Sequence, residues 1–169
     1  CRVDFVRGYV PYPTVDAEAV SRAAELINNA KKPLALVGHG VELGNAQQEL
    51  VDFIEKAGIP AARTMLGLSA LPTGHPLNMG MLGMHGNYAP NMKEQECDVL
   101  IAIGMRFSDR VICNPATYAK QAKIIQLDID GAEIDKNVKT DVAVVADCKE
   151  SLPAITKLLR PNSHKEWCE

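Results

Sequence analysis

The chain has 169 residues, 47% of them hydrophobic and 23% charged, with a formal net charge of −3. This composition is typical of one globular domain; the charge balance argues against nucleic acid and anionic membrane surfaces, and no apolar run approaches bilayer length. The five cysteines are widely spaced and form no CxxC pair, which argues against a disulfide framework or a zinc site and favours a reducing cytoplasm.

The first predicted elements are a linker, a helix and a strand. Residues 1–14 are irregular, and because the chain begins with Cys1 we expect them to link to a preceding domain of a longer protein. Asp16 is placed to cap a helix whose apolar positions recur at helical spacing, namely Val20, Ala23, Ala24 and Ile27. Residues 34–37 then form a short apolar run, which predicts a buried strand.

A second helix is predicted over residues 46–57, ending at Gly58. Its inward positions are expected to be Leu50, Val51, Phe53 and Ile54. Residues 59–65 follow as a second strand. Residues 66–91 are rich in glycine and methionine and poor in charge, so we expect a loop with one short strand over 78–82. A loop this apolar is unusual unless another domain or a ligand covers it.

The second half of the chain contains three more strand-like runs, at residues 99–103, 123–127 and 142–145. A last helix is predicted over 149–159. Strands alternating with helical segments predict an α/β fold with a doubly wound, mostly parallel, Rossmann-like sheet of about six strands. We expect one domain over residues 15–160, with 161–169 as the start of a linker to a following domain.

Three glycines follow the first predicted strand, in the spacing G-x-G-x-x-x-G at Gly38, Gly40 and Gly44. The dinucleotide fingerprint is one residue shorter and needs an acid near the end of the second strand, where this chain has Arg63. The glycines therefore fit two interpretations equally well. They either bring the backbone close to a cofactor or only allow a tight strand-to-helix turn.

The carboxyl ends of the predicted strands are more informative together than singly. In an open α/β sheet a ligand binds beyond these ends. They carry glycines for close approach, an arginine suited to a diphosphate, and acids suited to ribose hydroxyls. Together they favour a nucleotide-containing ligand, although strand ends are commonly rich in glycine and acids. The cluster of Arg106, Asp109 and Arg110 also fits a surface ion-pair group, and no nucleophile–base pair or metal set is evident.

Three stretches of the chain resemble one known family. They are MGMLGMHGNYAPN at 79–91, AIGMRFSDRV at 102–111 and QLDIDGAEIDKN at 126–137. Together they are similar to the central domain of acetolactate synthase, or acetohydroxyacid synthase, a thiamine-diphosphate-dependent enzyme of branched-chain amino-acid biosynthesis. The resemblance extends over residues 15–159 in the same order.

The resemblance implies that this domain binds FAD, which does no net redox in the family's main reaction. It places Gly38 and Gly40 along the cofactor, and the ribityl–diphosphate region beside Thr64, Met65 and Leu66. It implies backbone and side-chain approach by Leu82, Gly83, Met84 and His85. It further implies diphosphate–flavin contacts by Gly104, Met105, Arg106 and Arg110, and adenosine contacts by Asp128, Ile129, Asp147 and Cys148.

Two positions depart from the family pattern. Where the family commonly has RFDDRVTG, this chain has RFSDRVIC. Ser108 thus replaces an acid and Cys113 replaces a glycine. Ser108 can accept a hydrogen bond but brings no charge, and Cys113 puts a side chain where the backbone had freedom.

The resemblance also implies what the parent enzyme does. It would join pyruvate-derived hydroxyethyl to a second 2-ketoacid, using thiamine diphosphate and magnesium held by flanking domains. This chain has no GDG metal motif, so we expect no catalysis and no catalytic residue in it alone. The implied partners are the flanking domains, a second catalytic subunit in a homodimer or tetramer, and a regulatory subunit.

Two alternatives stay open from the sequence. One is the central domain of another thiamine-diphosphate enzyme, such as a glyoxylate carboligase or an oxalyl-coenzyme-A decarboxylase-like protein. The stretches GMLGMHGN and RFSDRV argue against it. The other is a non-catalytic nucleotide-binding or structural module, which would explain the missing catalytic residues without a parent chain.

Overall fold

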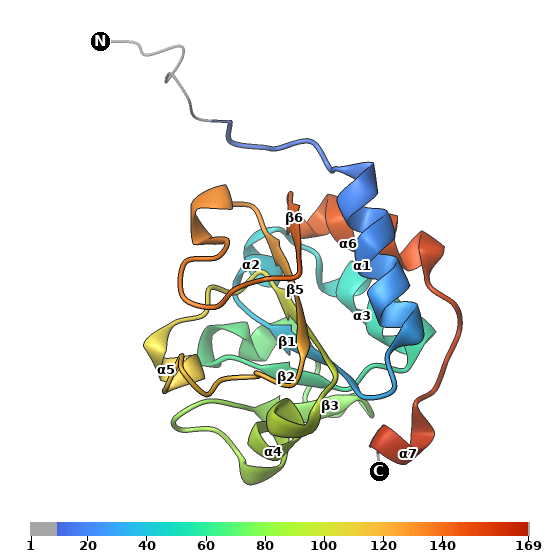
Figure 1. Cartoon of the computed structure of the whole chain (residues 1–169). Coiled ribbons are helices and arrows are strands. Elements are labelled where there is room, and N and C mark those ends of the chain that lie inside the picture. Colours follow the sequence, from blue (N-terminus) through green and yellow to red (C-terminus); the bar gives the residue numbers. More distant parts are fainter. Residues whose placement is uncertain (1–9, 169) are drawn as a thin grey trace.

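One sheet of six strands lies at the centre of the computed structural model, which describes residues 10–168 (Figure 1). The order across the sheet is β3-β2-β1-β4-β5-β6, and every neighbouring pair is parallel. This order is that of a dinucleotide-binding Rossmann sheet, so the predicted doubly wound α/β fold is confirmed. The strands are β1 (Pro33–Val37), β2 (Ala61–Arg63), β3 (Asn78–Met81), β4 (Val99–Ile103), β5 (Lys123–Asp128) and β6 (Val142–Val145).

Three longer helices cover one face of the sheet (Figure 1). They are α1 (Ala17–Asn29), α3 (Gln47–Ala57) and α6 (Cys148–Leu158). The other face is covered by shorter pieces and by the irregular segment 113–122. The pieces on this face are α4 (Tyr88–Glu96), α5 (Asp109–Ile112) and α7 (Lys165–Cys168). Three short turns of helix complete the chain: α2 (Gly40–Leu43) and the 3-10 helices η1 (Met65–Ala70) and η2 (Gly131–Glu133).

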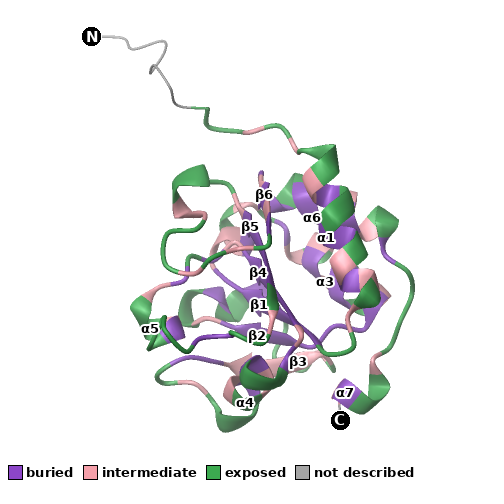
Figure 2. Ribbon diagram, viewed as in Figure 1, coloured by how far each residue is buried: buried purple, intermediate pink, exposed green. Residues whose placement is uncertain are grey.

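Because both faces are covered, the central strands are buried along their whole length. Figure 2 shows the central strands β1 and β4 buried, β3 at the edge of the sheet partly buried, and the outer side of α1 exposed. Alternate residues of β1 enter different clusters: Ala35 and Val37 pack beneath the long helices, whereas Leu34 and Leu36 pack on the opposite face. A continuous apolar run rather than an alternating one is typical of such a doubly covered parallel sheet.

Local signals set the ends of the long helices where the sequence predicts them. The Asp16 side chain accepts a hydrogen bond from the backbone N–H of Glu18, which caps α1. At its far end α3 stops at Gly58, whose φ of 60° lies in the left-handed region. Of the four residues expected to face inward on this helix, Leu50, Phe53 and Ile54 are buried and Val51 is partly buried against them.

The segment 66–91 contains more regular structure than a loop with one strand. β2 is shorter than predicted because the chain turns into η1 at Met65. The helix α4 begins at Tyr88 and its only buried side chains are Pro90 and Glu94, so it has no apolar stripe for the sequence to reveal. Pro90 is tolerated because it lies in the first turn, where its missing N–H costs no helical hydrogen bond. The segments 115–121 and 132–138 form turns.

The last described residues pack across the amino ends of the strands. Trp167 is only 6% exposed, and its indole N–H donates to the carbonyl oxygen of Pro33 at 2.8 Å. The ring of His164 lies within hydrogen-bonding distance of the carbonyl oxygens of Ala57 and Ala30. That 161–169 leads on to another domain stays a prediction. Most of the predicted linker over 1–14, Cys1 included, lies outside the described residues.

No helix within residues 10–168 is both long enough and apolar enough to cross a membrane. The longest of them, α1, has 13 residues and a polar outer face.

Candidate functional site

A cleft of about 740 Å³ lies at the carboxyl edge of the sheet. It is lined from the ends of β1, β2, β4, β5 and β6, around the point where the strand order reverses between β1 and β4. Ligands of open α/β sheets bind at such a reversal. Every predicted cofactor-binding residue except Gly83 lines this cleft. Their contact with a cofactor stays a prediction.

The glycines after β1 pack against the turn that follows β4. Gly38 N–H donates to the carbonyl oxygen of Ile103 at 2.9 Å, and Gly40 N–H donates to that of Gly104 at 2.8 Å. A Cβ added at Gly40 would lie 2.7 Å from the Cα of Gly104, and one added at Gly38 would overlap the Cβ of Met105. Protein backbone therefore already requires both glycines, whatever the cleft holds.

The third glycine of the pattern has a different neighbour. A Cβ added at Gly44 would lie 2.7 Å from Oδ1 of Asp147. That same oxygen accepts a hydrogen bond from the backbone N–H of Lys149 at 2.8 Å and so caps α6. Beside it, burial raises the pKa of the Cys148 thiol to about 12, so the thiol stays protonated.

One wall of the cleft is formed by η1, where the lining side chains are apolar: Met65 is 60% and Leu66 is 67% exposed. Arg63 holds this wall from behind. Its guanidinium donates to the carbonyl oxygens of Leu68 and Leu71, and burial lowers its pKa. In the sequence, Arg63 is notable only because it stands where the dinucleotide fingerprint has an acid. The structure places it outside the cleft, as the support of η1.

The opposite wall comes from the segment after β3. Leu82, Met84 and His85 line the cleft, whereas Gly83 does not. Gly83 has a φ of 101°, and its N–H donates to the side chain of Asn91 on α4 at 2.9 Å. The Asn91 amide in turn donates to the carbonyl oxygen of Gly83 at 3.2 Å. Gly83 therefore shapes this wall from outside the cleft.

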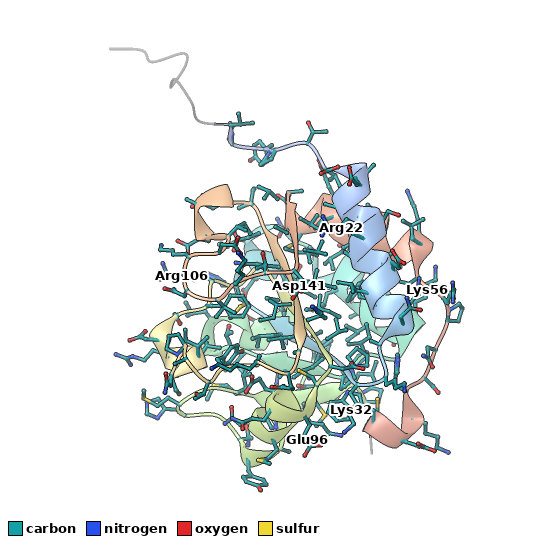
Figure 3. All side chains as sticks on the ribbon, in the orientation of Figure 1. Arg22, Lys32, Lys56, Glu96, Arg106 and Asp141 are labelled. Carbon is teal, nitrogen blue, oxygen red and sulfur yellow. The ribbon has the colours of Figure 1, made fainter. Side chains whose placement is uncertain are left out.

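Two arginines bring positive charge to the cleft. Arg106 follows β4, and Arg110 lies on α5. Figure 3 shows Arg106 on the same side of the molecule as α5. The predicted ion pair is present, with Arg110 Nε 3.9 Å from Asp109 Oδ2, but both side chains are largely exposed and the pair adds little stability. Cys113, which ends α5, has a φ of 51°, a strained value for a residue with a side chain.

Three carboxylates line the cleft at and after the end of β5. They belong to Asp128, Asp130 and Glu133. Burial raises the pKa of Asp128, and the neighbouring Glu133 and Asp130 charges raise it further. Asp128 also accepts a hydrogen bond from the backbone N–H of Asp130 at 3.0 Å. Within residues 10–168 no group of His, Cys, Asp and Glu has the arrangement of a metal site.

Several lining residues are not among those that the resemblance assigns to the cofactor. Asp130 is one of the acids that the sequence places at a strand end, whereas Glu133, further along the same QLDIDGAEID stretch, was not expected. Tyr12 and Leu43 gave no signal, because both are isolated apolar side chains in segments without a period. Met81, Ser108 and Val111 flank predicted positions.

The cleft suits an elongated ligand whose parts differ in polarity. Guanidinium groups bind phosphate oxygens through charge-assisted hydrogen bonds, and carboxylates accept hydrogen bonds from ribose hydroxyls. The exposed Met65 and Leu66 side chains, which follow β2, offer apolar contact to a further part of such a ligand. A dinucleotide combines these three features.

Comparison with known proteins matches residues 20–155 to the family described as thiamine pyrophosphate enzyme, central domain. The chain is 46% identical over 145 residues to the probable acetolactate synthase large subunit of Methanocaldococcus jannaschii, which covers 86% of this chain and 24% of that protein. It is also 46% identical over 167 residues to the acetolactate synthase large subunit of Corynebacterium glutamicum, covering 96% of this chain and 27% of that protein. The chain thus spans about a quarter of the length of these relatives.

Proposed function

This chain belongs to the thiamine pyrophosphate enzyme family, as a central domain of that family, and we propose that its cleft binds FAD within an acetolactate synthase large subunit. The observation that carries the proposal is the sequence of apolar, cationic and acidic side chains along the cleft. Met65 and Leu66 follow β2, Arg106 follows β4, and Asp128 ends the neighbouring strand β5. The similarity to acetolactate synthase large subunits supports the choice of FAD among dinucleotides.

Different residues of the cleft would bind different parts of the ligand. Arg106 and Arg110 would bind the diphosphate. Asp128 would accept hydrogen bonds from ribose hydroxyls at the adenosine end. Met65 and Leu66 would lie beside the ribityl chain, and Arg110 would also reach toward the flavin ring, which is the group that FAD supplies. The role of this chain is to hold and orient that ring and to shield it from water.

We assign the chemistry of the whole protein to segments beyond this chain. The longer enzyme would join a pyruvate-derived hydroxyethyl group to a second 2-ketoacid in branched-chain amino-acid biosynthesis, in the cytoplasm. Thiamine diphosphate and magnesium would be held by its other domains, and its partners would be a second catalytic subunit and a regulatory subunit. No residue of this chain is assigned a catalytic role.

The test is a titration of the chain with FAD, followed by quenching of flavin fluorescence. We expect saturable binding that Arg106→Ala weakens by about tenfold, because one charge-assisted contact to the diphosphate is lost. Arg160→Ala is the matched control. Arg160 is exposed and lies beyond the end of α6 that is remote from the cleft, so this variant should bind as the unaltered chain does.

Competing ligands separate this proposal from a nucleotide-binding module without flavin. FMN lacks the adenosine end, and ADP lacks the flavin. We expect both to bind more weakly than FAD, since each fills only part of the cleft. Equal affinity for ADP and FAD would contradict the flavin assignment. If FAD fails to bind both this chain and the full-length protein that contains it, the proposed function is wrong.

A further inference from the structure

The helix α4 carries a buried carboxyl group that the cleft does not use. Glu94 is 5% exposed, and it and Pro90 are the only buried side chains of α4. Its Oε1 atom has no hydrogen-bond partner. Among residues 10–168 no Lys, Arg or His forms an ion pair with it. An ionised carboxylate in such a position is costly, because nothing replaces the water it has lost.

The titratable groups nearest to Glu94 are a tyrosine hydroxyl and a thiol, both of which stay protonated. The hydroxyl of Tyr118, in the 113–122 segment, is also buried without a partner, and burial raises its pKa. The Cys97 thiol at the end of α4 donates to the carbonyl oxygen of Glu94, and burial raises its pKa to about 12. Negative charge on Cys113 would raise the pKa of Tyr118 further, and the Asp98 carboxylate raises that of Cys97. The one stabilising contact to a Glu94 carboxylate is the backbone N–H of Ala119.

The same helix holds a wall of the cleft. Asn91 lies one turn before Glu94 on α4, and its side chain makes both hydrogen bonds to the backbone of Gly83. Gly83 separates Leu82 and Met84, which line the cleft. At the other end of α4, the Gln121 amide donates to the carbonyl oxygens of Glu94 and Cys97. A shift of α4 would therefore reach the cleft through Asn91.

We propose that the Glu94 carboxyl is a proton-binding site, whose neutral form holds α4 on the sheet and thereby fixes the 82–85 wall of the cleft. Burial raises the pKa of Glu94 from 4.5 to about 7, which agrees with this role. The inference concerns the chain itself and holds whether or not the cleft binds FAD.

The sign of the pH dependence follows from the raised pKa. Between pH 4.5 and about 7 the unfolded chain has lost the Glu94 proton and the folded chain keeps it. The contribution of the neutral carboxyl is thus complete below pH 4.5 and is lost as pH rises to about 7. In that window the unfolding equilibrium constant should rise about tenfold per pH unit, and above it this dependence ends.

The first experiment compares denaturant unfolding of the unaltered chain with Glu94→Gln at several pH values. The amide cannot ionise, so the ratio of the two unfolding constants should rise about tenfold per unit between about pH 5 and about pH 7. Glu96→Gln is the matched control on the same helix. Glu96 is exposed near Lys32 (Figure 3), and its variant should follow the pH dependence of the unaltered chain. A ratio that stays constant with pH would overturn the proposal.

Two measurements on the unaltered chain do not depend on how Glu94→Gln folds. A carbon-13 NMR titration reads the carboxyl directly: a midpoint near 7 supports the proposal, and one near 4.5 overturns it. Hydrogen exchange reads the link to the cleft, because the Gly83 amide is bonded to Asn91. Its protection factor should fall as Glu94 ionises, and equal protection at about pH 5 and about pH 8 would contradict the coupling.

Discussion

At the scale of single residues, substitution of a glycine after β1 tests whether backbone packing or a ligand requires that glycine. Gly38→Ala would place a Cβ against Met105 and the carbonyl oxygen of Gly104. We expect it to lower the free energy of unfolding by about 1–3 kcal/mol without any ligand present. Gly74→Ala is the control, because an added Cβ there meets nothing within 4 Å. The measurement is urea denaturation of both variants.

One result would contradict the explanation that backbone packing requires Gly38. If Gly38→Ala unfolds at the same urea concentration as Gly74→Ala, the turn after β1 has room for a side chain. A weakened affinity for FAD in the same variant would then mark Gly38 as a site of close approach to the cofactor. The packing explanation given above would be wrong in that case.

The sequence could identify these glycines but not what approaches them. A glycine pattern records that some atom comes close, and it does not say whether that atom belongs to a ligand or to a neighbouring turn. The same limit applies to Gly83, whose backbone bonds to Asn91 and does not line the cleft; its contact with a cofactor stays a prediction. The charged positions were clearer, because Arg106 and Asp128 follow apolar strands and could be placed at one edge.

At the scale of elements, η1 depends on one buried arginine. Arg63→Met removes both charged hydrogen bonds to the carbonyl oxygens of Leu68 and Leu71. We expect a loss of about 2–3 kcal/mol in the free energy of unfolding, since two buried acceptors lose their donor. We also expect proteolytic cleavage within residues 65–71 of the folded chain, seen by mass spectrometry.

The control for this prediction is Arg160→Met, which removes an exposed arginine outside any strand or helix. It should leave both stability and the protease pattern unchanged. Faster cleavage elsewhere in Arg63→Met, with 65–71 intact, would show that Arg63 supports the sheet rather than η1.

Elements with a strong apolar pattern were predictable, and those held by polar contacts were not. All six strands were expected close to their observed positions. The central strands are predictable because doubly covered strands are continuous apolar runs, whereas β3 is only partly buried and was expected as the one short strand of a glycine- and methionine-rich segment. The helix α4 was missed because its stability comes from Asn91, Lys93 and Glu94 contacts rather than from an apolar face. Such contacts join residues distant in the sequence and leave no local period.

At the scale of the whole molecule, Trp167 belongs to the hydrophobic cluster on the face of the sheet opposite α1, α3 and α6, and it covers that cluster at the amino ends of the strands. It packs with Leu34, Leu36 and Leu100, and Lys93 lies over its ring. We expect Trp167→Ala to lower the free energy of unfolding by about 3–5 kcal/mol, measured by circular dichroism in denaturant. Trp167→Phe keeps an aromatic ring in the cluster and loses the N–H bond to Pro33, so it should cost about 1–2 kcal/mol.

Equal stability of Trp167→Ala and the unaltered chain would mean that this segment is not part of the folded unit. Packing of this segment on the sheet could not be predicted, because an isolated tryptophan near Asn162 and His164 shows no periodicity. Strand order is hidden from the sequence for a similar reason, since periodicity reports which residues are buried and not which strands are neighbours.

The pairing of β1 with β4 has a consequence for how the chain is made. One edge of β1 pairs with β2, which follows soon after it in the sequence. The other edge pairs with β4, which is made only after β2, β3 and α4. During synthesis from the amino end, that edge of β1 stays open until Ile103 has left the ribosome. Open strand edges pair with other chains. The middle of this sheet is thus the part of the nascent protein most exposed to aggregation, and the one that a chaperone would protect longest.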